Sequence, residues 1–128
     1  PYISAQMLGG LCGAIIVGKY GMTEFKVSLG YGMIIEIFIT FILMSSIYLI
    51  ISKTDNTKIV SIWVGSVVGI LAFIFGRFTG ASMNPARTLG PNIISGEYFN
   101  LPAFFISTII GALLAAELYN SIKSKAKN

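Results

Sequence analysis

The chain has 128 residues, of which 55% are hydrophobic and 11% are charged, and its formal net charge is +4. This apolar, weakly charged composition excludes an ordinary soluble domain and indicates an integral membrane protein. The basic cluster near the end (Lys123, Lys125 and Lys127) carries no interleaved aromatic residues, which excludes nucleic acid as a partner and favours a solvated tail beside a lipid bilayer. The sequence has no His and only one Cys, so it predicts no disulfide, no metal site, no cofactor and no enzyme of the common hydrolase or redox classes.

Four apolar segments follow one another along the chain, and we expect each to be a transmembrane helix. They are residues 2–17, 31–51, 59–75 and 101–119. A span needs about 20 mostly apolar residues, and in lipid a helix satisfies every backbone polar group within its own segment. No strand-like alternation of apolar and polar residues runs through these segments, so the predicted fold class is all-α integral membrane.

The two ends of the chain are predicted to lie on one side of the membrane, because the number of spans is even. The basic tail, residues 120–128, assigns that side to the cytoplasm by the excess of positive residues found there. The loop with Lys53 and Lys58 then also lies inside. The first loop carries Lys19 and Lys26, which weakens this bias without reversing it.

Small residues recur four positions apart in three of the spans, a spacing that lets helix backbones approach closely in lipid. The pairs are Gly9 with Gly13, Gly65 with Gly69, and Gly111 with Ala115. Three such pairs favour a tightly packed helical bundle.

Between the third and fourth spans lies the stretch TGASMNPARTLGP, residues 79–91. Asn84 is a preferred helix N-cap, and Pro85 suits the first helical position. A helix from Pro85 to about Ile94 is about 15 Å long, roughly half the thickness of the hydrocarbon core. With an extended run of small residues before it, the segment 79–94 is predicted to be a re-entrant loop and half-helix.

Such a loop can bind neutral polar solutes. The start of the half-helix carries a partial positive charge, which would lie near the Asn84 amide and Arg87 and repel cations, including hydronium. The carbonyls of Gly80, Ala81 and Ser82 would supply hydrogen-bond acceptors along the same path. The alternative is that Asn84 and Pro85 cap an ordinary helix in an extramembrane loop and that Arg87 is solvated.

The residues NPAR at 84–87, with TGAS before them and LGP after, resemble the second signature motif of the major intrinsic protein family, the aquaporins and aquaglyceroporins. The four spans also resemble the third to sixth helices of that family, so the resemblance covers residues 1–128 as one membrane domain. It implies a six-span, inverted-repeat channel of which this chain holds the last span of the first repeat and all of the second. Because the chain starts at Pro1 and enters a span at once, we expect a fragment of a longer channel; a natural half-protein is the alternative. The resemblance also implies water and small neutral solutes as partners, a homotetramer, and the plasma membrane as location.

The resemblance assigns roles to particular residues. Asn84, Pro85 and Ala86 would form the motif at the pore centre, with Arg87, Ala72 and Ala81 in the selectivity filter. Two small alanines imply a wide filter that admits solutes such as glycerol. Thr88, and the aromatic pair Phe104 and Phe105, instead resemble the water channels, so the choice between water and glycerol stays open.

Glu36 lies in the middle of the second span, where an acid costs about 2.5 kcal/mol or more. The resemblance implies that it accepts hydrogen bonds from the backbone of a re-entrant loop, with Gln6 in a similar supporting role. The alternative hypothesis is that Glu36 is a proton-carrying or catalytic acid, but the sequence offers no second catalytic group. A non-conducting membrane scaffold that packs through its small-residue faces is the remaining alternative to a channel.

Overall fold

The structure is a computed structural model and describes residues 1–125, without the side chains of Lys19 and Tyr20. The described residues form helices and connecting loops, with no β-strand among them. The elements are α1 (Tyr2–Val17), the short 3-10 helix η1 (Gly18–Gly21), α2 (Leu29–Ile51), α3 (Thr57–Thr79), α4 (Pro85–Ser95) and α5 (Leu101–Lys125). The prediction of an all-α fold is confirmed.

Three helices are long and apolar enough to cross a membrane, namely α2, α3 and α5. The first helix, α1, is apolar but has only 16 residues. Large apolar side chains on these helices face outward; Phe73 is 90% exposed and Ile16 is 86% exposed. Exposure of this kind is expected of helices that face lipid or further polypeptide rather than water.

Two helices extend beyond the predicted spans. α3 continues to Thr79 and ends where Gly80 adopts a left-handed conformation, with φ of 76°, which is a common helix C-cap. α5 continues to Lys125, so the part of the predicted tail from Asn120 to Lys125 is helical; Lys127 lies outside the described residues. No Gly or Pro interrupts this last segment, and Lys123 and Lys125 in its final turn complement the helix dipole.

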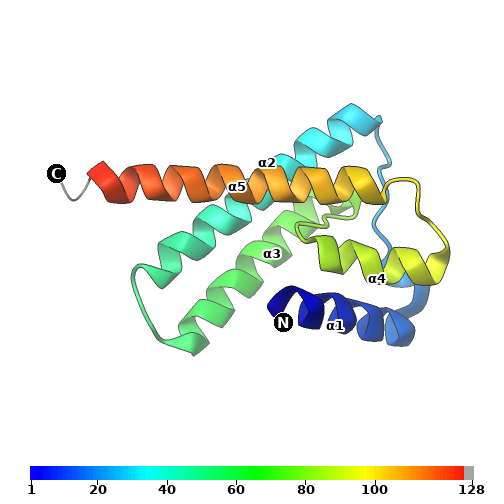
Figure 1. Cartoon of the computed structure of the whole chain (residues 1–128), viewed down its shortest axis with the longest axis horizontal. Coiled ribbons are helices and arrows are strands. Elements are labelled where there is room, and N and C mark those ends of the chain that lie inside the picture. Colours follow the sequence, from blue (N-terminus) through cyan, green and yellow to red (C-terminus); the bar gives the residue numbers. More distant parts are fainter. Residues whose placement is uncertain (126–128) are drawn as a thin grey trace.

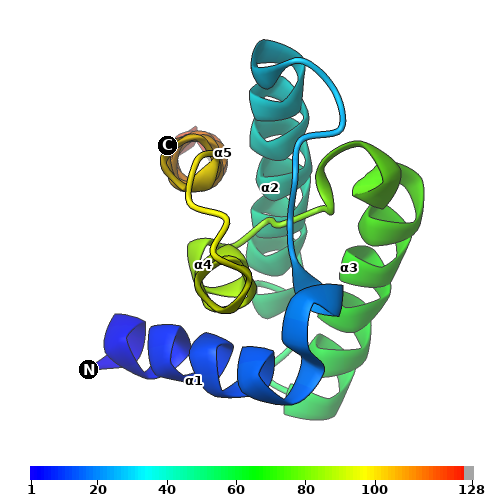
Figure 2. The ribbon, with the colours of Figure 1, turned by 90° about the vertical axis from the view of Figure 1, so that its right-hand side faces the viewer.

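The helices pack as two connected groups (Figures 1 and 2). α2 packs against both α3 and α5, and α1 packs against α4, which also contacts α5. Figure 2 shows the short α4 lying between α1 and α5. The core between α2 and α3 is made of buried Ile39, Leu43 and Leu71, together with Ala81 and Met83 from the loop before α4. The loop is therefore anchored in the apolar core.

Glycines set the closest helix contacts. A Cβ at Gly90 of α4 would overlap the carbonyl of Gly10 in α1, and a Cβ at Gly111 of α5 would lie 2.9 Å from the Cβ of Thr40 in α2. The predicted pair Gly111 and Ala115 is buried as expected.

The two other predicted glycine pairs face open space in this chain, with nothing within 4 Å of an added Cβ. They are Gly9 with Gly13 and Gly65 with Gly69. The close approach of α1 and α4 depends instead on Gly10 and Gly90. Neither residue belongs to the pairs that the four-residue spacing predicts.

Candidate functional site

Asn84 and Pro85 start α4. The Asn84 backbone is extended, and its Oδ1 accepts a hydrogen bond of 2.8 Å from the backbone N–H of Ala86. Pro85 takes the first helical position, where its missing N–H leaves no donor unpaired. The Nδ2 group of Asn84 makes no hydrogen bond with any described residue, so this donor is available to a ligand.

Glu36 holds the loop before α4 in place. Its side chain is completely buried and accepts three hydrogen bonds, one from the last residue of α3 and two from the loop. Oε1 accepts from the Thr79 hydroxyl at 2.6 Å and from the Ser82 backbone N–H at 2.9 Å, and Oε2 accepts from the Met83 backbone N–H at 3.0 Å. Both carboxylate oxygens of Glu36 are therefore occupied by hydrogen bonds to the loop and to the end of α3.

The backbone before α4 is not the extended run that the sequence predicts: Thr79 is the last residue of α3, and the loop that follows it is irregular. Ala81 and Met83 have φ of 47° and 55°, in the left-handed region that favours glycine. Two sets of contacts stabilise the left-handed conformation of Ala81 and Met83. The Glu36 hydrogen bonds fix the neighbouring N–H groups, and the Ala81 and Met83 side chains are buried in the core.

The carbonyls of Gly80, Ala81 and Ser82 accept no hydrogen bond among the described residues. An orphaned carbonyl inside a membrane protein is tolerated where water or another ligand can reach it.

Arg87 lies one turn into α4. Its Nη1 donates a hydrogen bond of 3.1 Å to the backbone carbonyl of Gly21, at the end of η1. Arg87 as a whole residue is exposed. The connection between α1 and α2 therefore positions the only charged side chain of α4.

A cavity of about 660 Å³ brings several predicted residues together. Ala72 of α3, Ala81 of the loop, and Asn84, Pro85 and Arg87 of α4 all line it.

Other predicted residues lie at the edge of this cavity or behind it. Gln6 lines the cavity but is exposed, and its amide makes no hydrogen bond with the described residues. Ser82 lines the cavity, whereas Gly80 and Ala86 do not. Ala86 is buried against α1, with its carbonyl at Gly10. Glu36 lies beneath the loop and outside the lining.

A buried polar network supports α4 from behind and was not anticipated from the sequence. The Thr23 hydroxyl donates to Thr88 Oγ1 at 2.9 Å, and Thr88 also contacts the Ser82 hydroxyl. Asn92 Oδ1 accepts from the Thr23 backbone N–H at 3.3 Å, and its Nδ2 donates to the Thr23 carbonyl at 3.1 Å. The pairing joins residues 69 positions apart, so no local pattern could reveal it.

Comparison with known proteins identifies the family. The family model described as major intrinsic protein matches residues 1–119. The chain belongs to the major intrinsic protein family. The predicted family is confirmed, and the fold is that of an all-α membrane protein.

The relatives come from distant organisms. Aquaporin-4 of Bos taurus is 37% identical over 134 residues, a match that covers 94% of this chain and 42% of the bovine protein. The probable aquaporin TIP2-2 of Oryza sativa subsp. japonica is 32% identical, covering 94% of this chain and 52% of the rice protein. Aquaporin-7 of Botryotinia fuckeliana is 35% identical, over 94% of this chain and 29% of the fungal protein. The chain thus spans less than half the length of the bovine relative.

Proposed function

We propose that this chain forms one wall of a passive transmembrane channel for water and small neutral solutes such as glycerol, and that the channel excludes protons and other ions. The observation that carries the proposal is the cavity of about 660 Å³ in which Ala72, Ala81, Asn84 and Arg87 meet. Polypeptide outside these 128 residues supplies the opposite wall. The family resemblance supports a homotetramer in the plasma membrane, and the basic tail supports a cytoplasmic C-terminus. The names of the relatives, all aquaporins, support the same function.

The site is suited to neutral hydrogen-bonding solutes. The Asn84 amide donates to a solute oxygen, and the unpaired carbonyls of Ala81 and Ser82, two lining residues, accept from its hydrogens; Gly80 lies outside the lining. A solute that exchanges its water partners for these groups keeps its hydrogen bonds as it passes, so the barrier to its passage stays low.

Charge accounts for the exclusion of cations. The N-terminus of α4, which carries about half a positive charge, begins at the cavity, and Arg87 adds a full charge nearby. A cation, including hydronium, meets both fields in a site of low dielectric constant, where they act strongly. A neutral solute meets the same fields but carries no net charge for them to repel.

Glu36 has a structural role in this proposal, because its oxygens are already engaged by Thr79, Ser82 and Met83. We therefore propose a channel and not an enzyme.

The test is stopped-flow light scattering on vesicles that hold the full-length protein, shocked with an impermeant sugar or with glycerol. We expect rapid shrinkage followed by fast glycerol entry. Ala72→Phe should slow glycerol entry at least about tenfold by filling the filter, whereas Ile70→Phe, which places the same ring outside the cavity lining on α3, should leave it unchanged.

The remaining outcomes separate the alternatives. Fast water flux without glycerol entry would keep the channel but refute the wide filter assigned to Ala72 and Ala81. No flux of either kind would favour a non-conducting membrane scaffold. Robust flux from a monomer of these 128 residues alone would refute the need for an opposite wall.

A further inference from the structure

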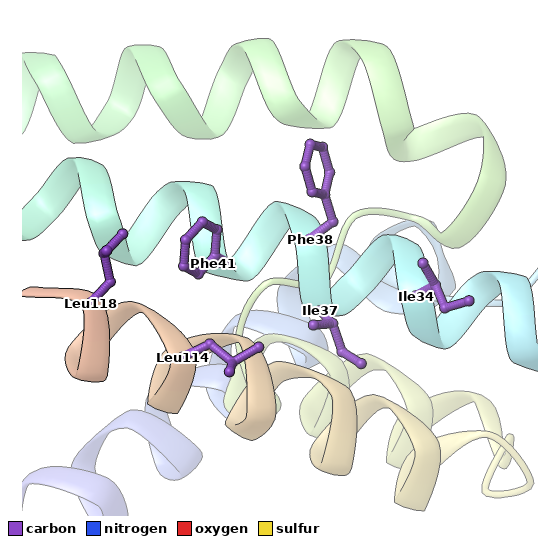
Figure 3. A pocket seen from close by; sticks show the side chains of 6 residues that line it. All are labelled: Ile34, Ile37, Phe38, Phe41, Leu114 and Leu118. Carbon is purple, nitrogen blue, oxygen red and sulfur yellow. The ribbon is translucent and has the colours of Figure 1, made fainter.

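An apolar groove runs between α2 and α5 on the outside of the chain. One hollow of about 510 Å³ is lined only by apolar side chains, as Figure 3 shows: Ile34, Ile37, Phe38, Phe41, Leu114 and Leu118. A second hollow of about 270 Å³ lies nearer the C-terminal ends of the two helices, and Tyr48 and Tyr119 are among the residues that line it. Leu118 lines both hollows, so they form one continuous α2/α5 groove.

The groove is long enough for a fatty acyl chain. On α2 it extends from Ile34 to Tyr48, which is about 21 Å at 1.5 Å per residue. One leaflet of the hydrocarbon core is about 15 Å thick. Side chains along the groove are open to the surroundings; Ile34 is 63% exposed and Leu114 is 50% exposed. In the described chain this surface is therefore open over the depth of a leaflet.

The groove ends in aromatic and then cationic side chains. Tyr48 and Tyr119 stack with ring centroids 4.8 Å apart and an interplanar angle of 14°. The Lys123 amine lies 5.8 Å from the centroid of the Tyr119 ring, one turn further along α5. Tyrosine is typical of the level where hydrocarbon meets headgroups, and a lysine beyond it reaches the phosphates.

The order of these side chains along the α2/α5 groove indicates which molecule binds in it. From the middle of the helices outward, the groove offers an apolar trough, then two phenol rings, then an ammonium group. A phospholipid with an anionic headgroup has the complementary order of acyl chain, polar backbone and negative charge. A second copy of this chain is the other candidate occupant of this apolar surface, and the experiment below distinguishes it from a lipid.

We propose that the α2/α5 groove is a binding site for an anionic phospholipid, whose acyl chain lies along Leu114 and Leu118 and whose phosphate binds Lys123. The site lies on the opposite side of α2 from Glu36 and the solute cavity, with which it shares no lining residue. Lipid binding is therefore separable from solute flux.

The experiment is native mass spectrometry of the full-length protein in detergent, titrated with phosphatidylglycerol or with phosphatidylcholine of identical acyl chains. Lys123→Ala should weaken phosphatidylglycerol binding about fivefold and leave phosphatidylcholine binding unchanged, since one lysine near the headgroups contributes that much to anionic-lipid affinity. Leu118→Trp should weaken the binding of both lipids by filling the junction of the two hollows. Both side chains are exposed, so neither change threatens the fold.

Two matched controls decide the interpretation. Lys58→Ala removes an exposed lysine at the start of α3, and Ile62→Trp adds the same bulk to an exposed position of α3. An equal loss with Lys58→Ala and Lys123→Ala would overturn the proposal in favour of general surface charge. Unchanged lipid binding in Lys123→Ala, or a change of oligomer mass in Leu118→Trp with lipid binding intact, would overturn it as well, the latter by making the groove a contact between copies.

Discussion

Replacing Glu36 with Gln tests whether the carboxylate holds the loop. The substitution keeps the size of the side chain but turns one acceptor oxygen into an NH₂ donor. If the remaining oxygen keeps the bonds from Thr79 and Ser82, the new NH₂ faces the backbone N–H of Met83, which is 3.0 Å from Oε2. The variant then loses one charge-assisted hydrogen bond and leaves a buried N–H without a partner.

Each of these effects has a known size. A hydrogen bond to a charged group contributes about 1.5–3 kcal/mol, and an unsatisfied buried donor costs about 1–3 kcal/mol, with overlap between the two. We expect Glu36→Gln to destabilise the protein by roughly 2–4 kcal/mol, which lowers the thermal unfolding midpoint by about 10 °C. Water flux should fall too, because the loop carbonyls lose their fixed direction.

The assay is thermal unfolding of the full-length protein in detergent, followed by stopped-flow water flux in vesicles. Glu97→Gln is the matched control, because Glu97 is exposed. Equal stability and equal flux in Glu36→Gln and the control would refute the anchoring role. Normal stability with a selective change in proton transport would instead support a proton-carrying acid.

Three further substitutions probe α4. Gly90→Ala should destabilise the protein by about 3 kcal/mol, because the new Cβ overlaps the Gly10 carbonyl, whereas Gly69→Ala meets nothing within 4 Å and should leave the thermal midpoint unchanged. Asn84→Asp should keep the helix cap and the midpoint while reducing water flux by loss of the amide donor; an equal loss of flux and stability would contradict the assigned donor role. Thr88→Val removes the hydroxyl between two buried partners and should lower stability by about 1–3 kcal/mol, and Thr88→Ser should restore it; equal midpoints for both variants would show that the network contributes no stability.

Much of the architecture follows from local patterns in the sequence. In lipid, a helix forms hydrogen bonds with all the polar groups of its own backbone. The apolar segments therefore predict an all-α membrane protein. The start of α4 at Pro85 is equally local, because the asparagine cap and the proline act on adjacent residues. The position of Glu36 within an apolar run shows that it needs partners, although only the resemblance points to the loop as their source.

Other features depend on tertiary structure and leave no local pattern. Gly10 and Gly90 are separated along the chain, and nothing in their spacing distinguishes them from Gly9 and Gly13, which face open space. The left-handed conformation of Ala81 contradicts its intrinsic preference and is stable only because a buried acid and an apolar core fix the loop. The pairing of Thr23 with Asn92 likewise becomes visible only when α4 has been placed.

The contact between Arg87 and Gly21 has a consequence for how this family member can vary. The partner of the guanidinium is a backbone carbonyl, so no particular side chain is needed at the end of η1 to aim the arginine. Mutations that change side-chain chemistry in this connection are tolerable where they keep its path, which excludes Gly18, whose φ of 63° favours glycine. Adding or removing one residue between α1 and Gly21 shifts the carbonyl by up to about 3.5 Å, which exceeds what a hydrogen bond tolerates. The length of this segment is therefore under constraint, in addition to the glycine at position 18 that sets its path.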